Sequence, residues 1–235
     1  MGLGLYTKIL DRLGDRLDAP TRRGALRRCR RRGLAVSTVI DVGASDGRWS
    51  KVAAQYLAAQ KYFLVEANPV HGEALENLKR RWPACDYILA AAGDHDGTLY
   101  FNSSDPFGGL ASHEPLMGQS CTELPAVRID TLGDRHQLPA PFLIKLDTHG
   151  FEIPILEGAA ATLKQTQILI IEAYNFTIAQ DSLRFHELCA YLEARGFRCL
   201  DLFDVLYRPK DGCLWQMDLV FAAKDLPCFQ DLAWN

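Results

Sequence analysis

The sequence predicts an α/β domain built on a mostly parallel seven-stranded sheet that ends in an antiparallel hairpin. From residue 36 onward, short apolar runs alternate with stretches of helical periodicity, a pattern typical of a parallel sheet with helices on both faces. Near residue 43 an apolar run breaks at a glycine and leads into a helical stretch. The last two apolar stretches, 199–207 and 214–223, are joined by a short turn, so we expect them to pair antiparallel.

The bulk properties favour one globular domain with a short extension. The chain has 235 residues, of which 48% are hydrophobic and 23% charged, and its net charge is −3. This charge creates no global field for nucleic acid, so we expect no nucleic-acid partner. There is no apolar run of about 18 residues and no signal-peptide pattern, so the cytoplasm is the expected compartment. Seven scattered cysteines without a Cys-x-x-Cys pair indicate neither a disulfide framework nor a zinc site.

Residues 1–33 are predicted to form a basic, amphipathic helical leader ahead of a domain that spans 34–235. Apolar residues recur there at helical spacing, namely Leu3, Tyr6, Ile9, Leu10, Leu13 and Leu17. Seven arginines then lie between Arg22 and Arg32. They indicate either a patch for an anionic partner, such as a sugar phosphate, a lipid headgroup or nucleic acid, or a solvated helix face that packs its leucines on the domain.

Apolar periodicity and turn residues assign the other elements. Short apolar runs predict strands at 38–42, 62–65, 87–91, 142–146 and 168–171, and helical spacing predicts helices at about 48–59, 70–81, 151–164 and 182–195. Further strands are expected at 98–102 and at 127–130, the latter ending in an acid. Glycine, serine and proline dominate residues 103–121, so we expect a long loop, either a substrate-binding lid or a disordered insertion.

The turn after the first strand predicts a nucleotide-like ligand. Backbone N–H groups are free where a strand breaks at a glycine and enters a helix. The turn reads Asp41-x-Gly43-x-x-x-Gly47, whereas a dinucleotide fingerprint would need glycine at positions 45 and 48. An acidic, wider turn suits a cationic amino acid and a sulfonium better than a pyrophosphate. We therefore predict S-adenosylmethionine here, with a plain structural turn as the alternative.

Four acids are predicted at the carboxyl ends of strands: Glu66, Asp130, Asp147 and Glu172. These ends share one edge of a parallel sheet, so the acids are expected to converge on one crevice. Glu66 can accept both ribose hydroxyls of a bound nucleoside, unless it is a helix-capping surface acid. Acids at 130, 147 and 172 would suit a hard divalent ion, but no spacing demands one, and no metal site is predicted.

Residues 145–152 (KLDTHGFE) are the most specific segment of the chain. Methyl transfer to oxygen requires donor and acceptor in line and removal of the proton of the alcohol. Asp147 or His149 is expected to take this proton, and Lys145 to orient the carboxylate or stabilise negative charge on the acceptor. The alternative is a structural salt bridge between Lys145 and an acid.

With these segments together, the chain resembles the FkbM-type methyltransferase family. Residues 39–47 (VIDVGASDG) are similar to its first motif, and residues 145–152 with 155–159 (ILEGA) are similar to its second. Segments 92–97, 128–132 and 170–173 fall where the family has similar sequences, so the resemblance covers about residues 36–175.

The resemblance implies a Rossmann-like class I methyltransferase fold and S-adenosylmethionine-dependent O-methylation, often of a sugar or polyketide hydroxyl. It places six residues at the cofactor: Asp41, Gly43, Ala44, Ser45, Gly47 and Glu66. It places Asp147 beside the reacting groups. The family more often has an acid where this chain has His149, which leaves the base open between the two, since histidine titrates near neutral pH.

We therefore expect an S-adenosylmethionine-dependent methyltransferase that acts on a small-molecule or glycan hydroxyl. One alternative is a nicotinamide-dependent oxidoreductase, which the missing glycines and the closing hairpin disfavour. The other is an inactive methyltransferase-like module that binds a partner through the arginine-rich leader.

Overall fold

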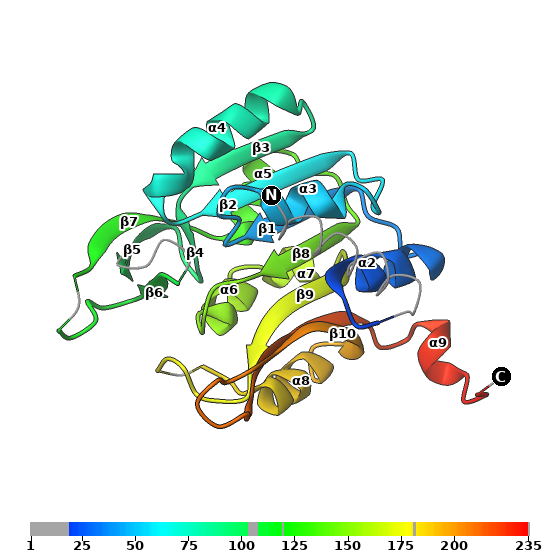
Figure 1. The fold of residues 1–235 in the computed structure, drawn as a ribbon. Coiled ribbons are helices and arrows are strands. Elements are labelled where there is room, and N and C mark those ends of the chain that lie inside the picture. The colour runs from blue at the N-terminus through cyan, green and yellow to red at the C-terminus, as the bar shows by residue number, and fades with distance from the viewer. Residues whose placement is uncertain (1–18, 103–107, 119, 181, 235) are drawn as a thin grey trace, which may run out of the picture.

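A central seven-stranded sheet organises the computed structural model, which describes residues 19–102, 108–118, 120–180 and 182–234 (Figure 1). The strand order is β10-β11-β9-β8-β1-β2-β3. The strands are β1 (Thr38–Val42), β2 (Lys61–Glu66), β3 (Cys85–Leu89), β8 (Phe142–Leu146), β9 (Thr166–Tyr174), β10 (Phe197–Tyr207) and β11 (Leu214–Ala223). β11 runs antiparallel to both of its neighbours, and the other pairs are parallel. The predicted sheet and its closing hairpin are confirmed.

Helices cover both faces of this sheet because successive strand side chains point to opposite sides. On one face, alternate strand residues such as Ile40, Ile144 and Leu169 pack in one core. The helices of that face are α5 (Ile129–Arg135), α6 (Glu152–Glu157), α7 (Ala160–Leu163) and α8 (Phe185–Glu193). On the other face, residues such as Val39 and Leu143 pack in a second core. Its helices are α2 (Arg22–Arg31), α3 (Arg48–Ala53) and α4 (Gly72–Arg81), the last preceded by the short helix η1 (Pro69–His71).

Helix α2 carries the arginine-rich segment and packs against this second core. Its buried residues are Gly24, Ala25, Leu26 and Cys29. Arg28 donates two hydrogen bonds to the carboxylate of Asp201 on β10, at 2.5 and 3.0 Å. This part of the leader therefore packs on the domain, as the second interpretation of the segment expects. The leucine pattern at 3–17 lies outside the described residues.

A second sheet lies beyond the carboxyl ends of the parallel strands, at the left of Figure 1. Its strands are β4 (Ala91–Ala92), β5 (Gly97–Asn102), β6 (Leu110–Ser112) and β7 (Thr122–Val127), in the order β4-β7-β5-β6. The strand predicted at 98–102 is thus present, and part of the predicted loop 103–121 is strand β6. The prediction of a strand at 127–130 is wrong, because β7 ends at Val127 and Asp130 lies in the first turn of α5.

At the far end of the domain, on the right of Figure 1, the short helix α9 (Pro227–Gln230) follows β11. Within the described parts of the chain, no helix has the length and apolar character needed to cross a membrane.

Candidate functional site

A cavity of about 420 Å³ lies at the carboxyl ends of the parallel strands. Its walls are the loops that follow β1, β2, β3 and β8, together with side chains of β9 and β11 and the edge of the second sheet. The residues concerned are Gly43–Ser45, Glu66–Asn68, Ala90–Ala92, Asp147–His149, Glu172, Gln216, Phe101, Gly109 and Ala111. The cavity therefore connects both motifs singled out in the sequence.

At two positions of the loop after β1, only glycine fits the backbone conformation and the space available. Gly43 has φ 73°, and a Cβ atom there would lie 2.0 Å from the carbonyl oxygen of Asp147. Gly47 has φ 74° and precedes α3, where a Cβ atom would lie 2.4 Å from Leu78. Positive φ costs other residues strain, and the close approaches exclude a side chain. The glycine spacing thus serves the packing of this loop against β8 and α4.

Glu66 holds two loops of the cavity together. Its Oε2 accepts a hydrogen bond from the Ser45 N–H at 2.6 Å, and its Oε1 accepts one from the Asn68 N–H at 2.7 Å. Burial raises the pKa of Glu66, and the two N–H groups oppose that shift. A carboxylate has about four lone-pair sites, so two remain for ligand hydroxyls. Glu66 is buried in the cavity wall, which does not fit the alternative of a surface helix cap.

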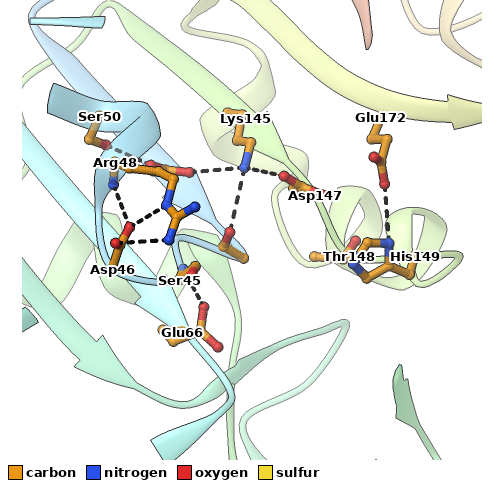
Figure 2. A network of polar contacts seen from close by, with 12 residues as sticks. Ser45, Asp46, Arg48, Ser50, Glu66, Lys145, Asp147, Thr148, His149 and Glu172 are labelled. Carbon is orange, nitrogen blue, oxygen red and sulfur yellow. Dashed lines mark hydrogen bonds and ion pairs between the residues drawn. The ribbon is translucent and has the colours of Figure 1, made fainter. Parts of the chain in front are cut away.

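Lys145 is buried between two carboxylates (Figure 2). Its Nζ lies 2.8 Å from Asp147 Oδ2 and 3.4 Å from Asp41 Oδ1. Asp41 is fully buried and also accepts a hydrogen bond from the Ser50 hydroxyl at 2.6 Å. Burial alone would lower the pKa of Lys145, but the negative charges of Asp147 and Asp41 raise it above its usual value. Lys145 is thus a fixed cation at the cavity floor. It forms the salt bridge that the sequence analysis gave as an alternative role for this residue.

The same lysine lowers the pKa of Asp147. Burial opposes ionisation of Asp147, yet the charge and hydrogen bond of Lys145 hold its pKa below the usual value. A carboxylate that binds protons this weakly is a poor general base near neutral pH. Asp147 therefore provides a fixed negative charge.

His149 is oriented by a second carboxylate. Its Nδ1 lies 3.1 Å from Glu172 Oε2 and 2.8 Å from the hydroxyl oxygen of Tyr174 (Figure 2 shows the contact with Glu172). Tyr174 and Gln216 both donate hydrogen bonds to Glu172. His149 has φ 54°, a conformation uncommon outside glycine, which its neighbours stabilise. A carboxylate that contacts one nitrogen of a histidine fixes the orientation of the ring and therefore of its second nitrogen, as in hydrolase triads.

Asp147, His149 and Glu172 each offer a ligand atom within 4.8 Å of the other two. Such a set fits a divalent cation in composition. In this structure, however, their atoms already contact Lys145, Tyr174 and Gln216. Protein contacts thus hold these three side chains together.

Most of the site residues predicted from the sequence line the cavity, namely Gly43, Ala44, Ser45, Glu66, Lys145, Asp147 and His149. Two predicted cofactor residues lie outside its lining: Asp41 is buried beneath Lys145, and Gly47 packs on α4. The expected convergence of four acids is wrong for Asp130. Its carboxylate accepts hydrogen bonds from the N–H groups of Ala161 and Thr162 and thereby joins α5 to α7.

The polar residues of the cavity that sequence reasoning missed include Arg22, His71 and Gln216. Gln216 reaches it because β11 pairs with β9 in a register that sets Gln216 opposite Tyr174. His71 Nε2 lies 3.4 Å from the Ser45 hydroxyl oxygen. No local pattern marks these positions, because each depends on a contact between distant segments.

Comparisons with known proteins agree with this architecture. Residues 41–199 match the Methyltransferase FkbM domain. No curated protein matches the sequence. A solved FkbM methyltransferase from Methylobacillus flagellatus KT is 17% identical with a TM-score of 0.51, over 78% of this chain and 43% of that chain. This similarity shows a shared fold, and the chain spans less than half the length of that protein.

Two further solved structures are more distant. TrmK from M. capricolum, in complex with S-adenosyl-homocysteine, is 10% identical with a TM-score of 0.48, over 87% of this chain and 69% of that chain. The N-methyltransferase NodS from Bradyrhizobium japonicum WM9 is 10% identical with a TM-score of 0.47, over 86% of this chain and 94% of that chain.

Proposed function

Because the chain belongs to the FkbM methyltransferase family, we propose that it transfers a methyl group from S-adenosylmethionine to a hydroxyl oxygen of a carbohydrate or related small molecule. One observation supports this most directly. A single cavity runs from Glu66, which suits a ribose, to the pair formed by His149 and Glu172, which suits removal of a hydroxyl proton. Family membership also leaves the nicotinamide-dependent alternative without support.

The donor half of the cavity fits a nucleoside with an attached amino acid. Glu66 retains about two lone-pair sites for ribose hydroxyls after its contacts with Ser45 and Asn68. Backbone of Gly43–Ser45 and the small side chains of Ala90–Ala92 line the adjoining wall. Asp147 adds a negative charge suited to a cationic donor. When bound, S-adenosylmethionine supplies an activated methyl group on its sulfonium.

The chain's own residues provide the proton chemistry. An alcohol must lose its proton as the new bond to oxygen forms. His149 accepts this proton, since Glu172 holds its ring from Nδ1 and stabilises the imidazolium that results. Asp147 positions charge and does not act as the base, because Lys145 keeps its pKa low. The proposal therefore gives the role of base to His149 and not to Asp147.

The acceptor half is polar, which favours an acceptor rich in hydroxyl groups. Thr148, His149, Glu172 and Gln216 line it with donors and acceptors of hydrogen bonds. A polyol such as a sugar can form hydrogen bonds with several of these groups at once, which an apolar acceptor cannot do.

The test has two stages. Calorimetry with S-adenosylmethionine measures binding by the full chain, and labelled donor is then incubated with the chain and a panel of glycans and cell-envelope extracts. The expected product carries the labelled methyl group as an ether on an oxygen atom. Absence of donor binding would overturn the proposal, and a label found only on nitrogen or carbon would overturn the O-methylation.

A further inference from the structure

Arg22 brings the arginine-rich helix α2 to the cavity. It is the first residue of α2 and one of the residues that line the cavity wall. The proposed function as stated above assigns no role to this helix. The position of Arg22 therefore raises the question of which ligand group its guanidinium meets.

Helix α2 holds Arg22 in place rather than presenting it on a loose tether. Thr21 caps the helix by accepting a hydrogen bond from the Gly24 N–H at 3.1 Å. One turn further on, Arg28 forms its two hydrogen bonds with Asp201. The Pro20 carbonyl accepts a hydrogen bond from the Asp204 N–H of β10 at 3.2 Å. The backbone on both sides of Arg22 is thus tied to the sheet.

The charge of Arg22 is available to a ligand, unlike that of the other cations at the cavity. Lys145 is paired with Asp41 and Asp147, and Arg48 donates two hydrogen bonds to Asp46 at 2.9 and 3.1 Å. Within the described part of the chain, Arg22 has no carboxylate partner. A guanidinium that lines a cavity without a protein carboxylate is suited to bind an anionic group of a ligand.

We infer that Arg22 binds the carboxylate of the methionine part of S-adenosylmethionine, an inference that rests on the proposed function. The donor carries this carboxylate whatever its acceptor is, and the acids of the cavity, Glu66, Asp147 and Glu172, repel it. Helix α2 packs beside α3, in the same core as Ala44 of the glycine loop that lines the donor half of the cavity. A carboxylate and a guanidinium form two parallel hydrogen bonds, so Arg22 fixes the orientation of the amino-acid end.

Two probes separate this carboxylate from the rest of the donor. S-adenosylhomocysteine retains the amino-acid end, whereas 5′-methylthioadenosine keeps the adenosine and thioether but lacks it. Calorimetry on the full chain should show that Arg22→Gln weakens binding of S-adenosylhomocysteine roughly ten- to hundredfold. Binding of 5′-methylthioadenosine should stay within about twofold of wild type, because only a screened charge is lost for that ligand.

The matched control is Arg30→Gln, which removes the same charge from an exposed position of the same helix. It should bind both probes like wild type. Arg22→Lys keeps the charge and the stem but loses the paired geometry, so it should weaken S-adenosylhomocysteine only and by less. This variant also serves if Arg22→Gln does not fold.

The outcomes are distinct. Unchanged affinity of Arg22→Gln and Arg22→Lys for S-adenosylhomocysteine would overturn the inference, and so would an equal loss for both probes. If wild type bound neither probe, the proposed function itself would fail.

Discussion

The ammonium of Lys145 lies 2.8 Å from the Oδ2 of Asp147, the residue that directly follows the strand carrying the lysine. The same ammonium lies 3.4 Å from Asp41 Oδ1 on the adjacent strand. One buried cation thus pairs with two carboxylates, of which Asp147 lines the cavity and Asp41 does not. This arrangement supports the fold and sets the charge of the site.

Replacing Lys145 with methionine should destabilise the protein by about 3–5 kcal/mol, because Asp41 would remain as an uncompensated buried charge. Adding Asp41→Asn should recover part of that loss, since the remaining carboxylate, Asp147, is partly exposed. Urea denaturation of the single and double variants measures both free energies of unfolding. A double variant no more stable than the single one would contradict this account of Asp41.

Gly43→Ala should destabilise the chain by about 3 kcal/mol or more, because a Cβ atom there would meet the backbone of Asp147 at 2.0 Å. Gly33→Ala is the matched control. Gly33 has a similar φ of 71° but no atom within 4 Å of a built Cβ, so it should cost only about 1 kcal/mol of backbone strain. Thermal melting compares the two variants, and equal losses would show that the close approach is unimportant.

Glu66→Gln should weaken binding of S-adenosylhomocysteine about tenfold, since a neutral amide accepts ribose hydroxyls less strongly than a carboxylate. The exposed acid Glu73 supplies the control Glu73→Gln, which should bind like wild type. Calorimetry gives the dissociation constants. An unchanged constant for Glu66→Gln would remove this carboxylate from the donor site.

His149→Gln should lower methyl transfer to the identified acceptor by roughly 10²–10⁴-fold while donor binding is retained, since a general base contributes about that much. Glu172→Gln should lower transfer less, because it orients the base without accepting the proton. Single-turnover label transfer separates these effects from binding. Should Asp147→Asn lose more activity than His149→Gln, the base would be reassigned to Asp147.

Asp218→Asn should stabilise the protein increasingly as pH rises. Burial and the nearby charge of Asp147 raise the pKa of Asp218 to about 8, although Lys145 opposes the shift. In the unfolded chain an aspartate has a pKa of about 4. Between these values the folded state holds a proton that the unfolded state has lost, so wild-type stability falls with rising pH.

The Asp218→Asn variant has no carboxyl group at this position, so it does not lose stability in this way as pH rises. Its advantage in free energy of unfolding should grow between about pH 4 and pH 8, reach about 1–3 kcal/mol and then level off. Urea denaturation at about pH 5 and pH 8 tests this, and an advantage independent of pH would contradict it.

Much of the donor side was predictable because its signals are local. Strands β1 and β8 were predicted at the bounds observed, since short apolar runs report burial without reference to partners. The glycine turn after β1 and the closing hairpin were also predicted, because each is specified by neighbouring residues. The convergence of Glu66, Asp147 and Glu172 followed from the rule that parallel strands end at one edge.

The failures concern pairing between distant segments. Asp130 was placed with the other acids because residues 127–130 were predicted to be a strand, whereas β7 ends at Val127 in the second sheet and Asp130 lies in α5. The choice of His149 as base depends on Glu172 and Tyr174, which residues 145–152 cannot show by themselves.

By itself, then, the sequence determined the layers, the positions of the central strands and several of the residues that line the cavity, because these depend on periodicity and short-range turn chemistry. Only the tertiary structure decided which carboxylates pair with Lys145, which histidine contacts a carboxylate, and that Arg22 and Gln216 reach the same cavity. Those features depend on the distances between side chains that folding brings together from distant parts of the chain, and electrostatic effects of this kind vary steeply with distance and burial.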